Sequence, residues 1–347
     1  MRDFACSREA DGMETATNTL LGLALPEAPH PSWDVWLLHI PGQPRFRIVY
    51  RVHHALQDGA GAAYALLALL ADHPTSGPHP HRAALPTGRG WLLAGRNLLT
   101  ALRPDKTWPA LRATPSHRTR WVHSDVTESH LRGMALRHSV TVNDVCLAGI
   151  ADALGRWHRA LPDTVRSTQK LSVLVPMSFR EEHELYAVGN RLTSYRLTLP
   201  CHLTDIEHSI RHIRQQTQAA RTHRVRHAAR PALRLLPVTL GQRMVGAVYG
   251  VTAAPIVISN ITLPAMFTCL NGRLSAASLI CDPVNRRLCY ISFTHAAGLI
   301  RCGIVCDDAL PQATTIPALW RQAVGAIASD GHTTHHRSTA AVPPLSE

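Results

Sequence analysis

A short segment with two adjacent imidazoles and a carboxylate, HHALQDG at residues 53–59, carries the side chains of this chain best suited to chemistry. Imidazole has an unperturbed pKa of about 6.5 and accepts a proton readily near neutral pH. A bare pair of histidines is ordinary in a chain with 22 of them, but the full HHxxxDG spacing is much rarer by chance. The segment therefore predicts a catalytic loop in which a histidine acts as a general base.

The elements on either side place this segment where a strand runs into a helix. Upstream, the run RFRIVYRV at residues 45–52 largely alternates arginine with apolar side chains, the period-two pattern of a strand with one buried face. Downstream, residues 60–71 are mostly Ala and Leu, as in a buried helix. Asp58 stands near the start of that helix, where its carboxylate can turn back and brace the loop.

Six motifs together resemble those of one enzyme family. In chain order they are WDVW at 33–36, HHALQDG at 53–59, NDVCLA at 143–148, VPMSFR at 175–180, GN at 189–190 and SNITLP at 259–264. This series resembles the bacterial wax ester synthase/diacylglycerol acyltransferase family, within the superfamily of chloramphenicol acetyltransferase and nonribosomal-peptide condensation domains. The resemblance covers roughly residues 25–330.

The resemblance implies an α/β fold of the two-lobed chloramphenicol-acetyltransferase type, with mixed sheets flanked by helices and a tunnel between the lobes. The chain departs from the family in two places. The family has a much longer segment before its HHxxxDG, and its SNVPGP-like motif reads SNITLP here. We therefore expect a reduced N-terminal lobe over residues 1–118, the remainder of the fold over 119–330, and a disordered tail over 331–347.

Several elements follow from the local pattern. Residues 1–24 are weakly patterned and are expected to form a frayed start. Two helices are predicted over residues 124–161, the first capped by Asp125 or Thr127 and the second by Thr141. Strands are expected over residues 171–176, 288–294 and 300–307, a helix over 316–327, and a long connection holding one helix over 73–117.

The resemblance also implies roles for the motif residues. His54 would be the general base, with no covalent acyl-enzyme, and His53 would hydrogen-bond or pack against its own loop. Asp58 would not touch substrate but would pair with a distant arginine and fix the shape of the loop. Arg180 is its expected partner by family position, and Arg51 is the nearby rival.

Three more residues support this arrangement. Gly59 would allow a close backbone approach or an unusual dihedral angle after Asp58. Asn143 either caps a helix or donates to a substrate oxygen, and the resemblance favours the substrate side. Asp144 is expected to stabilise the helix N-terminus electrostatically. The sequence does not identify the groups that would bind the oxyanion.

Composition agrees with a globular enzyme. Hydrophobic residues make up 45% and charged residues 17%. No run reaches the roughly 18 apolar residues of a membrane span, and no secretory signal is recognisable, so a cytoplasmic location is expected. The eight cysteines form no CxxC pair and are expected to be buried, reduced thiols that bind no metal.

The chain is basic, with 36 Lys and Arg against 24 Asp and Glu and a net charge of +12. Much of this excess falls in residues 211–243. Three explanations compete for that segment: a solvated helix face, attraction to an anionic lipid surface, and nucleic-acid binding. No aromatic platform or nucleic-acid motif accompanies the charge, so no nucleic-acid partner is expected. A basic surface also suits the phosphates of coenzyme A.

Three functions remain open from the sequence. The first is an acyl-CoA-dependent O-acyltransferase that esterifies a long-chain alcohol, a diacylglycerol or a specialised-metabolite hydroxyl, with no cofactor beyond acyl-CoA as co-substrate. The second is a condensation enzyme that takes its acyl group from a carrier protein. The third is a catalytically degenerate binding protein of the same fold. For the reduced N-terminal lobe two expectations stay open: either a second copy or a partner covers it, or the acceptor side is more open than in lipid-making relatives.

Overall fold

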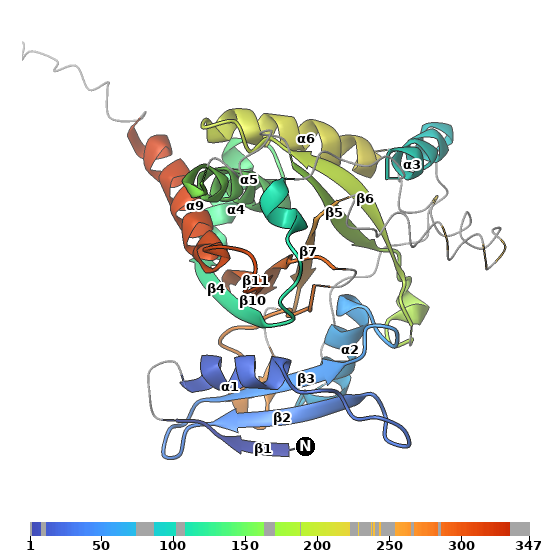
Figure 1. Ribbon diagram of the computed structural model, residues 1–347, viewed down its shortest axis with the longest axis vertical. Helices are drawn as coiled ribbons and strands as arrows, with labels where there is room; N and C mark the ends of the chain where they lie inside the picture. Colours follow the sequence, from blue (N-terminus) through green and yellow to red (C-terminus); the bar gives the residue numbers. More distant parts are fainter. Residues whose placement is uncertain are drawn as a thin grey trace, which may run out of the picture.

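A small N-terminal sheet lies beneath a larger sheet and its helices in the computed structural model (Figure 1). The structure describes residues 2–7, 12–73, 87–101, 108–162, 171–187, 189–222, 254–264, 267–283 and 286–333, with four single positions between 223 and 253. The two sheets and their flanking helices give the mixed α/β architecture that the sequence predicts.

The small sheet carries the strand that leads into the HHxxxDG segment. Its strands are β1 (Arg2–Ala5), β2 (Trp33–His39) and β3 (Phe46–Val52), in the order β1-β2-β3. β1 runs parallel to β2, and β3 runs antiparallel to it. Helix α1 (Gly12–Leu21) covers one face of this sheet, and helix α2 (Gly59–Leu70) contacts β3 directly after the motif.

The expectation of a frayed start is wrong for the described part of residues 1–24. β1 and α1 both lie there, and α1 buries Leu20 against Leu38 of β2 together with Cys6 and Ile40. The few apolar residues of α1 are spread among threonines, so the helical pattern in its sequence is weak. Leu20 is nevertheless fully buried. The expected cover by a partner or a second copy stays a prediction.

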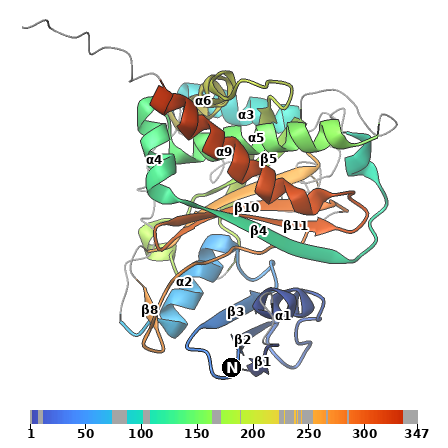
Figure 2. The same ribbon diagram turned by 90° about the vertical axis from the view of Figure 1, so that its left-hand side faces the viewer.

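The larger sheet has six strands in the order β4-β11-β10-β7-β5-β6. These strands are β4 (Thr119–Thr127), β5 (Leu171–Ser178), β6 (Leu192–Leu199), β7 (Ile256–Thr262), β10 (Cys289–Ala296) and β11 (Leu299–Asp307). Helices α4 (Glu128–Arg137), α5 (Val142–Ala160), α6 (Ile206–Thr222) and α9 (Ile316–Thr333) lie on the same side of this sheet (Figure 2). The strands expected over 171–176, 288–294 and 300–307 are confirmed.

The remaining described elements are short or peripheral. They are helix α3 (Gly88–Ala101), the hairpin β8 (Thr268–Cys269) with β9 (Gly272–Arg273), and the 3-10 helices η1 (Pro109–Arg112), η3 (Glu182–Glu184) and η4 (Ala313–Thr315). Helix α9 continues to Thr333, beyond the expected end at 327 and into the segment expected to be disordered. Residues 334–347 lie outside the described residues.

The main core lies between the large sheet and α5. Most residues of α5 are buried, and Thr141 begins the helix with a reciprocal capping box with Asp144, so the predicted cap at Thr141 is confirmed. The prediction that Asp125 or Thr127 caps α4 is only partly right. Thr127 stands at the N-cap without a side-chain hydrogen bond, whereas Asp125 lies in β4 and pairs with Arg301.

The six-stranded sheet opens between two of its parallel strands. β5 and β7 pair only at two positions, Val173 with Ile256 and Leu174 with Val257. Beyond these positions β5 continues to pair with β6 as far as Ser178, and β7 continues to pair with β10. Pairing between β5 and β7 is therefore confined to their first halves, and the segment that follows β5 contacts the motif loop.

The two sheets are also joined through α1. The side-chain amide of Asn18 donates to the main-chain oxygen of Trp121 at 3.1 Å, and the main-chain N–H of Trp121 donates to Asn18 Oδ1 at 2.7 Å. Arg47 of β3 lies over the indole of Trp121, 5.7 Å from the ring centroid. α1 and β3 are thus attached to β4 of the large sheet.

All eight cysteines are free thiols, and seven of them are buried, as predicted; Cys281 is half-buried. Burial raises the pKa of these thiols, for example that of Cys306 to about 11, so they remain protonated at neutral pH. Among the described residues, no helix is long and apolar enough to cross a membrane.

The packing of α5 against the turn after β6 generates a stability prediction. A Cβ atom on Gly155 would lie 2.3 Å from the main-chain oxygen of Cys201, so Gly155→Ala must push helix and turn apart. We expect a loss of about 1–3 kcal/mol in the free energy of unfolding, measured by urea denaturation. Gly133→Ala in α4 is the matched control, because the nearest atom to its added Cβ is 3.7 Å away. That control should be neutral or stabilising by up to about 1 kcal/mol, and an equal loss in both variants would contradict the close contact.

Candidate active site

The HHxxxDG segment forms the loop between β3 and α2. The main-chain N–H of His53 donates to the oxygen of Ser32 at 2.9 Å, which continues the β2–β3 pairing to the first histidine. At the other end Asp58 is the N-cap of α2, and its Oδ1 accepts from the N–H of Gly61 at 2.8 Å. The loop is therefore fixed at its start by the sheet and at its end by a helix cap.

Asp58 forms a buried ion pair with Arg180, across 122 residues of sequence. Arg180 Nε and Nη2 donate to Asp58 Oδ1 at 3.3 and 3.2 Å, and the main-chain N–H of Arg191 donates to Asp58 Oδ2 at 2.7 Å. Both side chains are only 2% exposed. Burial of two charges is costly unless their remaining donors and acceptors are satisfied, and here both carboxylate oxygens are engaged.

The guanidinium of Arg180 is satisfied by main-chain oxygens as well. Its Nη1 donates to Glu184 at 2.9 Å and to Ala187 at 2.8 Å, and its Nη2 donates to Gly189 at 2.8 Å. Arg180 follows β5, so it gathers the loop after β5 around the carboxylate that ends the HHxxxDG segment. The pairing of Asp58 with a distant arginine is the arrangement that the resemblance implies.

The rival Arg51 is engaged elsewhere. Its Nε donates to Asp34 Oδ1 at 2.9 Å, and its Nη1 donates to the main-chain oxygens of Leu20 and Leu23 at 2.6 and 2.7 Å. Burial alone would raise the pKa of Asp34, but the hydrogen bonds from Arg51 hold it below its usual value. Arg51 therefore ties the motif strand to the end of α1 and does not serve Asp58.

Two glycines permit the close approach of this network. A Cβ on Gly61 would lie 2.6 Å from Arg180 Nη2, so only glycine lets the guanidinium reach the start of α2. A Cβ on Gly59 would lie 3.2 Å from a methyl carbon of Leu279, a tight contact with a flexible side chain. The close approach expected at Gly59 is present, but the tighter one is at Gly61, which the sequence reasoning missed.

A second set of contacts joins the middle of the loop to the segment after η3. The N–H of Gly189 donates to the oxygen of Leu56 at 2.6 Å, and Gln57 forms a parallel bridge with Gly189. The hydroxyl of Tyr50 donates to Gln57 Oε1 at 2.9 Å. The GN motif at 189–190 thus contacts the HHxxxDG loop directly, and its position in the motif series was the only signal for this.

Both imidazoles of the loop are exposed. Nδ1 of His53 accepts a hydrogen bond of 3.2 Å from the N–H of Ala55, within its own loop. His54 makes no hydrogen bond to any residue that the structure describes. The loop is therefore rigidly held at Leu56, Gln57 and Asp58 while the side chain of His54 is left accessible to a substrate.

Asn143 lies near the start of α5 but does not cap it, because Thr141 has that role. Asn260 of β7 instead donates its amide to Asn143 Oδ1 at 2.8 Å. The capping alternative for Asn143 is therefore wrong. Nδ2 of Asn143 has no hydrogen-bond partner in the described part of the chain, so it is a donor held in place by Asn260.

The two asparagines and the Asp58–Arg180 pair lie at the same edge of the large sheet. Asn260 is in the carboxyl-terminal half of β7, and Arg180 follows the carboxyl end of β5, which runs parallel to β7. Parallel strands end at the same edge of a sheet. Arg180 with the motif loop therefore lies at the carboxyl end of β5, and Asn260 with Asn143 lies toward the same end of β7.

Asp144 is fully buried and links α5 to α6. Its oxygens accept from the hydroxyl of Thr217 at 2.7 Å and from Arg221 Nη1 and Nη2 at 3.3 and 3.2 Å. Burial alone would raise the pKa of Asp144, but hydrogen bonds from Arg221, Thr141 and Thr217 hold it below its usual value. As expected, Asp144 serves the N-terminus of its helix, where it forms the capping box with Thr141.

Arg221 belongs to the basic segment at 211–243, and its ion pair with Asp144 corrects the expectation for that residue. It is a structural contact rather than a purely solvated or lipid-binding charge. Arg224, Arg226, Arg230 and Arg234 lie outside the described residues.

A buried histidine near the same edge was not singled out by the sequence. His295 of β10 lies opposite Thr262 of β7, and its Nε2 is buried without a hydrogen-bond partner among the described residues. Burial lowers the pKa of His295, so the ring is neutral at physiological pH. No group of three or more metal-binding side chains converges within the described part of the chain.

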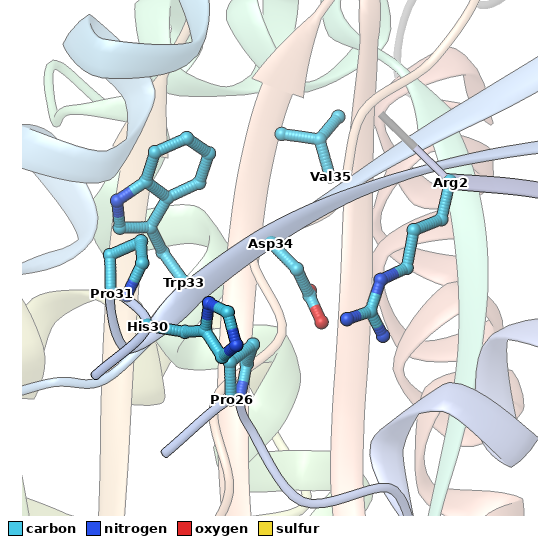
Figure 3. A pocket seen from close by; sticks show the side chains of 7 residues that line it. All are labelled: Arg2, Pro26, His30, Pro31, Trp33, Asp34 and Val35. Carbon is cyan, nitrogen blue, oxygen red and sulfur yellow. The ribbon is translucent and has the colours of Figure 1, made fainter. Parts of the chain in front are cut away.

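A pocket of about 240 Å³ opens at the start of β2. Its lining residues are Arg2, Pro26, His30, Pro31, Trp33, Asp34 and Val35 (Figure 3). Trp33 lies 6.2 Å from the ring of Tyr50, which in turn bonds to Gln57. The pocket is thus next to the motif strand, although no HHxxxDG residue lines it.

The buried ion pair generates the first prediction for this site. Asp58→Asn keeps an acceptor for the Gly61 N–H but leaves the Arg180 charge unpaired, so we expect a loss of about 3 kcal/mol in the free energy of unfolding by urea. Arg180→Met should cost a similar amount. The double variant should show a coupling energy of at least about 0.5 kcal/mol. Arg51→Met is the control, because Arg51 pairs with Asp34 and its effect should simply add to that of Asp58→Asn. If the effects of Asp58→Asn and Arg180→Met were also strictly additive, the ion pair would not be what fixes the loop.

The lowered pKa of Asp144 generates a pH prediction. A carboxyl whose pKa is lower in the folded than in the unfolded chain stabilises the protein above the unfolded value of about 3.9 and loses this contribution as pH falls through the folded value. Asp144→Asn should therefore be less stable than the unchanged chain at neutral pH, and the difference should narrow below about pH 4. Urea unfolding of both proteins over a pH series measures this difference in the free energy of unfolding. The other acidic residues titrate in both proteins, so their contributions cancel in the difference. A difference that stays constant with pH would contradict the assignment.

Comparisons with known proteins bear on the fold. By sequence alone the chain matches no family profile and none of the curated proteins. Its structure is similar to the wax ester synthase/diacylglycerol acyltransferase from Marinobacter aquaeolei VT8, with a TM-score of 0.66 and 18% identity, covering 95% of this chain and 79% of that one.

Two further solved structures share the arrangement. The starter condensation domain of rhizomide synthetase, in complex with C8-CoA and Leu-SNAC, has a TM-score of 0.58 at 11% identity and covers 95% of this chain and 76% of that one. The epimerization domain from the third module of tyrocidine synthetase B has a TM-score of 0.56 at 14% identity, covering 96% and 80%. The chain therefore has the acyltransferase-type fold that the wax ester synthase shares with condensation and epimerization domains.

Proposed function

We propose that this chain is an acyl-CoA-dependent O-acyltransferase in which His54 is the general base. The observation that carries the proposal is the construction of the HHxxxDG loop. A buried ion pair, a helix cap and a main-chain bridge hold the loop at Leu56, Gln57 and Asp58, whereas His54 is exposed and unpaired among the described residues. A rigid support beneath one free imidazole is what proton abstraction from a bound hydroxyl requires.

The chemical step needs one base and one group that stabilises negative charge. Nε2 or Nδ1 of His54 takes the proton of the alcohol as its oxygen attacks the thioester carbonyl. The tetrahedral intermediate then expels the thiolate, which takes the proton back from His54, so the products are an ester and a free thiol. The Nδ2 amide of Asn143, held by Asn260, is the donor that we assign to a substrate oxygen near this edge.

Two observations support a CoA thioester as the donor. The condensation domain of rhizomide synthetase has this fold and is in complex with C8-CoA. The net charge of +12 also favours a substrate with several phosphates. The alcohol would be a long-chain alcohol, a diacylglycerol or a hydroxyl of a specialised metabolite.

A carrier-protein-dependent condensation is the second candidate, favoured by the likeness to condensation and epimerization domains. A binding protein without turnover is the third. A thiol-release assay with several acyl-CoAs, a pantetheinyl carrier protein and a panel of alcohols separates the three. Release from acyl-CoA supports the first, release from the carrier protein alone supports the second, and no release with any donor supports the third.

Substitution of the two histidines tests the assignment of the base. His54→Ala should lower the rate of ester formation by at least about 10²-fold, because a positioned general base contributes roughly that much. His53→Ala is the matched control and should reduce the rate less, since His53 bonds to its own loop. Both variants should unfold at the same urea concentration as the unchanged chain. Equal residual rates in the two variants would overturn His54 as the base.

A further inference from the structure

One face of helix α3 carries a stripe of exposed apolar side chains. Trp91, Leu92 and Leu99 are 42%, 74% and 64% exposed. At 100° per residue these three side chains, together with Gly95, fall on one side of the helix. Scattered exposed leucines are ordinary, but a tryptophan and two leucines aligned on one face form a patch.

The opposite side of α3 attaches the helix to the rest of the molecule. α3 packs against β6, and Gly90 is buried while Leu93 and Ala94 are half-buried. Figure 1 places α3 at the periphery, beyond one end of α6. Trp91, Leu92 and Leu99 thus point away from the side of α3 that carries Gly90, Leu93 and Ala94.

Two arginines border the apolar stripe. Arg89 and Arg96 are both exposed and, by the same helical spacing, lie together along one side of it. α3 has no acidic residue. A helix with Trp and Leu on its outer face and Arg at the border has the composition of helices that lie in the headgroup region of a membrane.

We propose that α3 is an interfacial helix that docks the protein on an anionic phospholipid surface. Trp91, Leu92 and Leu99 would enter the boundary between headgroups and acyl chains, and Arg89 and Arg96 would contact the phosphates. Each arginine adds attraction to a negatively charged surface. The proposal does not depend on His54 or on turnover, although an enzyme acting on lipid-soluble alcohols would meet them at such a surface.

The charge pattern favours a lipid surface over a second copy of the chain. In a two-fold symmetric contact the same patch meets itself. Two copies of α3 would then bring four arginines together without one acid on the helix, and like charges in such a contact repel.

Vesicle binding tests the stripe. We expect the unchanged protein to co-sediment with phosphatidylcholine vesicles that contain phosphatidylserine and to bind pure phosphatidylcholine much less. Leu92→Glu with Leu99→Glu should lower the partition coefficient by about tenfold or more, because two apolar contacts are replaced by repelled charges. Leu136→Glu with Arg137→Glu on α4 is the matched control, since Leu136 is 80% exposed and lies outside α3. The control should bind almost as well as the unchanged protein.

The arginines and the tryptophan give two independent measurements. Arg89→Gln with Arg96→Gln should weaken binding at low salt, and the difference should disappear as salt screens the charges. Lipids with brominated acyl chains should quench the fluorescence of the bound protein, and Trp91→Phe should remove most of that quenching whereas Trp33→Phe should not.

The proposal is overturned if the unchanged protein does not bind the anionic vesicles, or if the α3 and α4 variants bind equally. A concentration-dependent dimer that Leu92→Glu with Leu99→Glu abolishes, without vesicle binding, would assign the stripe to a second copy. Thiol release from acyl-CoA with a short, water-soluble alcohol should be the same in the α3 variants and the unchanged chain. That measurement separates failure of membrane docking from failure of the proposed chemistry.

Discussion

The buried pair of Asp58 and Arg180 is the constraint on which the candidate site depends. Asp58 caps α2, accepts from the main chain at Arg191 and binds a guanidinium whose other donors reach the loop after β5. One carboxylate thus joins the N-terminal sheet, the helix after the motif and the split edge of the large sheet. Because both charges are almost completely excluded from water, any other arrangement of Asp58 and Arg180 would leave a buried charge unpaired at a high cost in free energy. The position of the loop, and with it that of His54, follows from this pair.

The split between β5 and β7 gives the second half of the site its place. Parallel pairing between β5 and β7 stops after Leu174 and Val257, and both strands then continue toward the edge of the sheet at their carboxyl ends. β5 leads to Arg180, and β7 carries Asn260, which orients Asn143 at the start of α5. Behind this edge lies the main hydrophobic core, to which β5, β7 and α5 all contribute buried side chains.

Local sequence pattern predicted the elements whose signals are local. The strand before the motif, the cap at Thr141 and the buried strand predicted over 171–176 follow from spacing and side-chain type. The role of Arg180 came from its place in a series of motifs. Contacts between distant segments had no local signal: Asn143 meets Asn260 across 117 residues and Asp144 meets Arg221 across 77. α1 was missed because its buried residues include Gly12, Ala16 and Thr17, so small and polar side chains stand where an apolar stripe would be recognised.

The contact between Asn18 and Trp121 has a further consequence for how this protein behaves in concentrated solution. Among the strands that the structure describes, β4 is the outermost on its side of the six-stranded sheet, with β11 as its one strand neighbour. Such an edge is a template for pairing with another chain and hence for aggregation. The side-chain amide of Asn18 offers one donor and one acceptor to the same residue, as a neighbouring strand would. By occupying these main-chain groups of Trp121, the first helix therefore protects the edge of β4 from pairing with a strand of another molecule.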